Sequence, residues 1–202
     1  MRTLVVARHG ESEFSARKLM NGDPSVRVPL TATGREQARE LGRLLAADRL
    51  DLCAVTEFER VRETADLALA EREVPRLVVP ELNDPRVGPF EGKALDEYRR
   101  WATDRGPTDA PEGADARAAL AERYARGFRI LLDRPEDSIL LVAHSLPIRY
   151  ALEAAEGRHP EARAEQVPYA TPFRLDAEQV QGVVALLEAW AAAPVFSVTM
   201  DS

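Results

Sequence analysis

The sequence predicts an α/β fold, a three-layer α/β/α sandwich in which helices cover both faces of a mostly parallel sheet. Two stretches, residues 4–7 and Ser138–Ala143, are mostly apolar and have the composition of buried strands. Shorter strand-like runs lie between them, separated by stretches whose apolar residues have helical spacing. Strands that alternate with amphipathic helices are typical of a parallel sheet covered on both faces.

Length and composition are those of one globular domain. The 202 residues are enough for a sizeable core, and we expect residues 1–202 to form a single domain because no linker or internal repeat divides them. Contents of 45% hydrophobic and 30% charged residues are ordinary for a soluble globular protein. No apolar run is long enough to span a bilayer, and no basic segment followed by an apolar one begins at Met1.

Charge and cysteine content narrow the partners and the compartment. The net charge of −7 predicts a surface that repels nucleic acid and anionic lipid, so we expect neither as a partner. The single cysteine, Cys53, excludes an internal disulfide, is expected to be buried and inert, and indicates a reducing compartment, the cytoplasm. The three histidines, His9, His144 and His159, lack metal-ligand spacing, so we expect no metal or other cofactor.

The first half of the chain alternates strand and helix signals. Gly10 allows a sharp exit from the first strand, and a long polar loop follows. Pro80 ends the third strand. The elements expected up to that point are a strand over 4–7, a loop over 12–29, a helix capped by Thr31 or Thr33, a strand over 51–56, a helix beginning near Glu57 and a strand over 76–79.

The alternation breaks after residue 80. Two prolines and two glycines in 82–92 indicate a loop, and we expect an insertion over 82–113 above the carboxyl edge of the strands. The elements expected there and beyond are helices over 94–101 and 115–133, a strand over Ser138–Ala143, a helix over 146–155, an edge strand over 169–175, a helix from the cap Asp176 to about 192, and a tail over 194–202 that is a short strand or loose.

Polar residues follow three of the predicted strands. Arg8 and His9 follow the first strand, Arg60 comes soon after the second, and His144 ends the fourth. The carboxyl ends of parallel strands share one edge, so we expect these side chains to converge. An imidazole beside guanidinium groups is suited to attack an anion, and phosphate is the obvious candidate.

Five ordered pieces of the chain resemble the histidine phosphatase superfamily, also called phosphoglycerate-mutase-like. The resemblance runs along most of the length of the chain, and the order and spacing of the pieces are more specific than any one of them. The pieces are RHGES at 8–12, PLTATG at 29–34 with Gln37 and Ala38, TEFERVRETA at 56–65, LND at 82–84 with Gly88 and Glu91–Gly92, and VAH at 142–144.

The resemblance implies a phosphohistidine mechanism. His9 would attack the phosphorus in line, and Arg8, Arg60 and His144 would surround the phosphoryl oxygens. Positioning and electrostatics supply most of the rate in phosphoryl transfer, so these cations make a metal unnecessary. The expected activity is hydrolysis of a small phosphate monoester, such as a sugar phosphate or a nucleotide-like molecule.

The leaving alkoxide needs a proton, which the resemblance assigns to the loop over 82–92. Asp84 stands where the family usually has Glu, and it reaches one methylene less. A bare turn is the alternative interpretation of this tripeptide, Asn83 to Pro85. Glu81 and Glu91 are the fallback acids, and Glu91 is expected rather to support the loop.

Five further positions qualify the resemblance. Ser15 replaces an Asn and is expected to donate to phosphate. Ser145 replaces a Gly, and its hydroxyl is expected to reach phosphate or to cap the next helix, with the cap slightly favoured. Arg99 and Arg100 are expected on a solvated helix face, which leaves the arginine clamp of the mutases without a clear counterpart. Arg62 is expected to be structural.

Two other functions stay open. A mutase would return the phosphoryl group to a second hydroxyl, and the missing clamp argues against it. A non-catalytic binding module would bind phosphate without turnover, and the joint presence of His9, Arg8, Arg60 and His144 argues against it. The resemblance does not identify the substrate, which we expect 12–29 and 82–113 to select. The oligomeric state is not predicted, although an edge strand over 169–175 could pair in a dimer.

Overall fold

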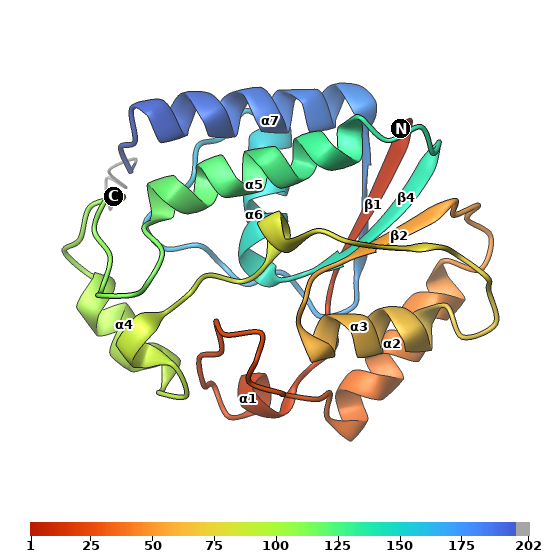
Figure 1. The fold of residues 1–202 in the computed structure, drawn as a ribbon, viewed down its shortest axis with the longest axis horizontal. Coiled ribbons are helices and arrows are strands. Elements are labelled where there is room, and N and C mark those ends of the chain that lie inside the picture. Colours follow the sequence, from red (N-terminus) through yellow and green to blue (C-terminus); the bar gives the residue numbers. More distant parts are fainter. Residues whose placement is uncertain (197–202) are drawn as a thin grey trace, which may run out of the picture.

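The computed structural model describes residues 1–196, in which five strands lie between two layers of helices (Figure 1). The predicted α/β sandwich is therefore confirmed. The strands are β1 (Thr3–Arg8), β2 (Leu52–Val55), β3 (Arg76–Val78), β4 (Ser138–Ala143) and β5 (Pro172–Asp176). The helices are α1 (Glu13–Ala16), α2 (Ala32–Leu44), α3 (Glu59–Ala68), α4 (Leu95–Ala102), α5 (Arg117–Leu132), α6 (Ser145–Ala155) and α7 (Ala177–Ala192), with 3₁₀ turns η1 (Pro80–Leu82) and η2 (Gly88–Phe90).

The sheet has the order β3-β2-β4-β1-β5. Strand β4 pairs in parallel with both β1 and β2, and β3 pairs in parallel with β2. Strand β5 runs antiparallel to β1 at the edge. The carboxyl ends of β1, β2 and β4 consequently share one edge, which is where an open α/β sheet places its ligands.

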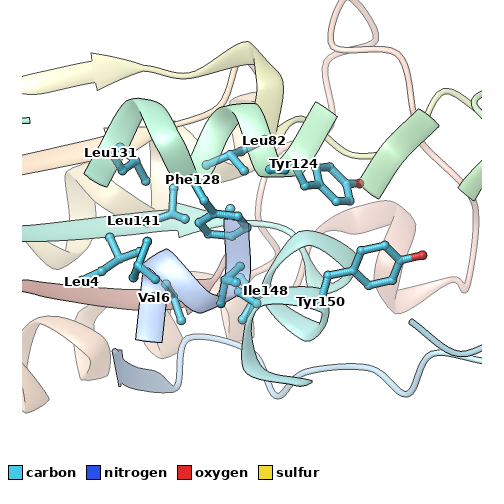
Figure 2. Packing of buried hydrophobic residues seen from close by; sticks show 14 of the residues in the cluster. Leu4, Val6, Leu82, Tyr124, Phe128, Leu131, Leu141, Ile148 and Tyr150 are labelled. Atoms are coloured by element: carbon cyan, nitrogen blue, oxygen red, sulfur yellow. The ribbon is translucent and has the colours of Figure 1, made fainter. Parts of the chain in front are cut away.

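The sheet is buried on both faces because its side chains alternate between two cores. Leu4 and Val6 of β1 pack under α5, α6 and α7, whereas Val5 and Ala7 pack against α2 and α3. Figure 2 shows the first of these cores, in which Phe128 of α5 lies over β1 and β4. Burial on both faces explains why the strands are continuous apolar runs in the sequence.

Several element bounds differ from the predicted ones. The edge strand begins at Pro172, because Ala170 has a positive φ of 46° and Tyr169 makes only an isolated bridge to Arg8. Thr31, and not Thr33, caps α2, with Oγ1 accepting from the Gly34 N–H at 3.0 Å. Of the tail predicted over 194–202, residues 194–196 belong to no helix or strand, and the rest lies outside the described residues.

Candidate active site

Five predicted residues meet at the carboxyl edge of the sheet. Arg8 ends β1 and His9 follows it, while His144 directly follows β4. Arg60 lies in the first turn of α3, and Asp84 lies just after η1. The two histidine rings are 5.5 Å apart between centroids. Residues distant in the sequence thus form one cluster, as their positions after the strands predict.

His9 is held in one tautomer. Arg60 Nε lies 3.1 Å from His9 Nε2, and because a guanidinium only donates, Nε2 carries the lone pair. His9 Nδ1 then carries the hydrogen and donates to the Gly10 carbonyl oxygen at 2.7 Å. Burial lowers the pKa of His9 well below its usual value, and the charges of Arg60 and Arg8 lower it further. His9 is therefore a neutral imidazole at neutral pH, and its Nε2 lone pair accepts the hydrogen bond from Arg60.

The backbone beside His9 requires glycine at position 10. A Cβ on Gly10 would lie 2.3 Å from the Gly34 carbonyl oxygen, and a Cβ on Gly34 would lie 2.0 Å from the Glu11 carbonyl oxygen. The Gly10 N–H donates to Thr64 Oγ1 at 3.0 Å. The two glycines let the turn after β1 lie directly on the start of α2, and this close approach fixes the position of His9.

Arg60 is the centre of the hydrogen-bond network. Its guanidinium donates to Asp84 Oδ2 at 2.9 Å and lies 3.2 Å from His144 Nδ1. It also donates to Asn21 Oδ1, and the Phe58 ring lies 4.2 Å from its central carbon. Only 4% of its side chain is exposed. Arg60 is thus a buried cation in contact with both histidines and with the carboxylate.

His144 is fully buried between two hydrogen-bonding groups. Its Nε2 lies 2.9 Å from Thr56 Oγ1, and its Nδ1 faces Arg60. Neutral His144 therefore carries its hydrogen on Nε2, because Arg60 donates to Nδ1. Burial, and then the charge of Arg60, lower the pKa of His144 well below its usual value. An anion bound beside Nδ1 would oppose this shift and favour a protonated ring that donates to the anion.

Asp84 is an ion-pair partner of Arg60 at the edge of the cavity. Its Oδ2 lies 3.4 Å from His144 Nδ1 as well as 2.9 Å from Arg60. Burial raises the pKa of Asp84 above its usual value, although the charges of Arg60 and Arg8 act in the opposite direction. A raised pKa widens the pH range in which the carboxyl group carries a proton, and the protonated form is the one that a general acid needs.

The loop that carries Asp84 is braced by two side chains. Asn83 Oδ1 accepts from the Glu57 N–H at 3.1 Å, and Asn83 Nδ2 donates to Glu57 Oε2 at 2.7 Å. Arg123 of α5 donates to the carbonyl oxygens of Pro80, Glu81, Asn83 and Asp84 at 3.0–3.4 Å. The predicted turn is therefore a fixed support for the carboxyl group.

Glu81 and Glu91, the alternative candidates for the general acid, do not line the cavity. Glu91 accepts from Asn21 Nδ2 at 2.8 Å and from the Gly22 N–H at 2.7 Å, which confirms the expected support of the loop. Neither Glu91 nor Glu81 lines the cavity into which Asp84 faces. Asp84 is thus the only one of the three carboxyl groups placed for proton transfer.

Arg8 is held by neutral groups. Its Nη1 donates to the Val167 carbonyl oxygen at 2.8 Å and to Gln166 Oε1 at 3.2 Å. The Tyr169 ring lies against the guanidinium, 3.9 Å from its central carbon to the ring centroid. Burial lowers the pKa of Arg8. Arg8 is 5% exposed, and no ion pair is formed by it within residues 1–196.

Ser15 and Ser145 line the cavity, but both hydroxyls are bonded to protein groups. Ser15 Oγ accepts from the Ser12 N–H at 2.7 Å at the start of α1. Ser145 Oγ accepts from the Val167 N–H at 2.8 Å. The preference for Ser145 as a helix cap is wrong, because the N-cap position of α6 belongs to His144 and no side chain caps it. Phosphate contacts of the two serines stay predictions.

The site opens into a cavity of about 910 Å³. Its walls come from 12–21, from the insertion between 84 and 109, and from 162–169. Arg99 and Arg100 of α4 are exposed, as expected, yet they also line this cavity. Arg117 of α5, the start of α6 and Phe196 complete the walls of the cavity beside His9.

Three further observations concern metal ligands, membrane-spanning helices and the cysteine. Within residues 1–196 no group of three or more His, Cys, Asp or Glu side chains is placed to hold a metal ion. Across the same residues, no helix is long and apolar enough to cross a membrane. Cys53 is buried in β2, and burial raises the pKa of its thiol to about 12, so it is unreactive as predicted.

Sequence reasoning missed several residues of the site. Thr56 could have been found, because it is a polar residue directly after a buried strand at the same edge. The others lie in irregular segments, or on a helix face that only the fold turns toward the site. The missed residues are Asn21, Thr56, Arg123, Gln166 and Tyr169.

Two histidines and two arginines gathered at the carboxyl edge of a mostly parallel sheet define the class of this molecule, an α/β protein with a histidine- and arginine-lined site. The chain belongs to the histidine phosphatase superfamily (branch 1), whose family model matches residues 4–189. The predicted family is therefore confirmed.

Known relatives include both phosphatases and mutases. The chain is 33% identical over 152 residues to the adenosylcobalamin/alpha-ribazole phosphatase of Escherichia coli, covering 70% of this chain and 72% of the relative. It is 31% identical over 173 residues to the 2,3-bisphosphoglycerate-dependent phosphoglycerate mutase of a Methylobacterium strain, covering 77% and 81%. The crystal structure of the alpha-ribazole phosphatase of Shigella flexneri is similar with a TM-score of 0.75 at 27% identity, covering 86% and 90%.

Proposed function

We propose that the protein is a phosphomonoesterase whose His9 forms a covalent phosphohistidine. The observation that most directly supports this is the tautomer of His9, which leaves the unprotonated Nε2 beside Arg60 in a residue that lines the cavity. The proposed catalytic residues are His9, Asp84 and His144, and the proposed phosphate-binding residues are Arg8, Arg60, Ser15 and Ser145.

In the first step, the bond from His9 Nε2 to phosphorus forms and the ester P–O bond breaks. Arg60 Nε must release Nε2 and turn its donors to the phosphoryl oxygens, where Arg8 and protonated His144 also donate. Asp84 gives its proton to the leaving alkoxide. Loss of one such preorganised donor typically lowers the rate by about 10²–10³-fold.

In the second step, water attacks the phosphohistidine. The Asp84 carboxylate accepts the proton of the attacking water, the new P–O bond forms, and the P–N bond breaks. His9 returns to its neutral form and inorganic phosphate leaves. Positive charge comes from arginine and histidine side chains throughout, so we expect turnover without a metal.

The size and lining of the cavity support a substrate larger than a triose phosphate. A volume of about 910 Å³ lies in the range of pockets that hold drug-sized ligands. Phe14, Tyr98 and Trp101 line it together with Lys18 and Arg105, a combination suited to a phosphorylated molecule with an apolar or aromatic part. Similarity to alpha-ribazole phosphatases also favours a hydrolase over a phosphoglycerate-type mutase.

The first test is phosphate release from an aryl phosphate in excess chelator. We expect the wild type to turn over, and His9→Ala to lose at least about 10³-fold in kcat. His159→Ala is the matched control, because His159 is exposed and does not line the cavity. Equal turnover by wild type and His9→Ala would exclude His9 as the nucleophile.

The same assay separates the two other functions. Transfer of the phosphoryl group to a second hydroxyl, in place of water, would indicate a mutase. Binding of inorganic phosphate without turnover of any ester would indicate a binding module. Trapping of a phosphorylated His9 in acid-quenched enzyme would support the covalent step directly.

A further inference from the structure

Arg8 is a buried cation that has no anionic partner. A buried charge is normally paired with an opposite charge, because leaving it alone in the interior is costly. No carboxylate in residues 1–196 forms an ion pair with Arg8, and its buried Nε has no hydrogen-bond partner there. Every group that holds its guanidinium comes from the short segment 165–170.

We propose that Tyr169 is a positioning residue that holds Arg8 against the phosphoryl group, and that segment 165–170 is a neutral clamp on this arginine. This inference rests on the proposed function, in which Arg8 binds phosphoryl oxygens.

The chemistry of the clamp explains why it is neutral. A carboxylate beside Arg8 would cancel the charge that the phosphoryl group needs. The Tyr169 ring at 3.9 Å attracts the guanidinium through its π face and carries no net charge, and the Val167 carbonyl and Gln166 amide oxygens are equally neutral. Arg8 is therefore held in place by groups that carry no net charge, and its Nε–H, which has no partner among residues 1–196, is a donor left for an incoming oxygen.

The clamp is itself anchored to both sides of the site. The Ala170 N–H donates to the Arg8 carbonyl oxygen at 2.9 Å, and the Val167 N–H donates to Ser145 Oγ at 2.8 Å. Ala170 has a φ of +46°, a conformation that non-glycine residues adopt only where the surroundings impose it. Because Ser145 follows His144, the clamp connects the end of β1 to the start of α6.

The test measures the affinity for inorganic phosphate by isothermal titration, together with kcat and KM for an aryl phosphate. Tyr169→Leu keeps an apolar side chain but removes the π face, and we expect it to weaken phosphate binding and kcat/KM about tenfold. Tyr169→Phe keeps the ring and should stay within about twofold of wild type. Phe173→Leu removes a partly buried ring four residues away and should leave both values unchanged.

A double-mutant cycle with Arg8→Ala tests whether Tyr169 acts through Arg8. We expect Tyr169→Leu to cost nothing further once Arg8 is gone. An equal loss in both backgrounds, or unchanged phosphate affinity in Tyr169→Leu alone, would overturn the clamp. Should Tyr169→Leu fail to fold by circular dichroism, Gln166→Ala replaces it, with an expected loss of about threefold that also vanishes in Arg8→Ala.

The binding readout keeps this inference separate from the proposed function. A wild type that binds phosphate through Arg8 but hydrolyses no ester would overturn the phosphatase, and the cycle would still support or overturn the clamp. Phosphate binding that is the same in wild type and Arg8→Ala would overturn the clamp whatever the turnover.

Discussion

Two residues of the site have pKa values shifted in opposite directions. His9 must be neutral to attack, and its pKa lies well below 6.5, so the rate rises with pH only in the acid range. Asp84 must be protonated to donate, and its pKa lies above 3.8, so the rate falls as pH rises through that raised value. We expect a bell-shaped dependence of kcat/KM on pH for an alkyl phosphate, with its acid limb well below 6.5.

The two limbs can be assigned by substitution. Asp84→Asn should lower kcat/KM for the alkyl phosphate by about 10²–10⁴-fold and abolish the alkaline limb while the acid limb stays. Glu81→Gln is the matched control and should keep both limbs, because Glu81 does not line the cavity. An alkaline limb that persists in Asp84→Asn would assign the acid to another group.

At the scale of elements, α5 supports the acid through Arg123. Its guanidinium bonds four carbonyl oxygens of the segment that ends in Asp84. We expect Arg123→Met to misplace the acid and to lower kcat about tenfold for an alkyl phosphate, whose leaving group needs the proton. Turnover of an aryl phosphate with a good leaving group should change much less.

The control for this prediction is Arg126→Met on the same helix. Arg126 is exposed and pairs only with Glu122, so both substrates should behave as with wild type. Equal losses on the alkyl and the aryl phosphate in Arg123→Met would mean that Arg123 stabilises the fold and does not position the acid.

The contact between the turn after β1 and α2 depends on Gly10. A Cβ there would meet the Gly34 backbone at 2.3 Å, and backbone cannot move aside as a flexible side chain can. We expect Gly10→Ala to lower the free energy of unfolding by about 1–3 kcal/mol and to lower activity, measured by urea denaturation and by aryl phosphate turnover.

Gly182→Ala in α7 is expected to have the opposite effect on stability. Nothing lies within 4 Å of a Cβ at that position, so alanine should stabilise the helix by up to about 1 kcal/mol without changing turnover. If Gly10→Ala had the stability and the turnover of the wild type, the close contact between Gly10 and Gly34 would be contradicted.

At the scale of the whole molecule, the site residues that could be predicted from the sequence are those at the ends of periodic strands. Arg8, His9 and His144 lie at the ends of apolar strands, so their convergence follows from the rule that parallel strands end at one edge. Asn21 and Tyr169 lie in irregular segments, where no periodicity relates a residue to its direction in space. Their contacts with Arg60 and Arg8 depend on the path of the whole chain.

The first and last residues of the elements, and the hydrogen-bond partners of side chains, were harder to predict than the elements themselves. The position of β5 at the sheet edge was predicted from Pro172. The residue at which β5 begins depends on the positive φ of Ala170, and an alanine in a sequence does not indicate that conformation. The hydroxyl of Ser145 was assigned to its own helix, whereas its partner, Val167, is far along the chain. Long-range hydrogen bonds of this kind have no local signal in a sequence.

The place of β1 has a consequence for how the protein is made. This strand is made before both of its neighbours, β4 and β5, which are encoded after residue 137. Until those strands emerge, an apolar segment next to His9 has no partner in the sheet, and such exposed segments are where nascent chains aggregate or recruit chaperones. A chain whose translation stops just before residue 138 therefore carries His9 and Arg60 but lacks His144 and both strands that flank β1, so the cluster around His9 is never completed.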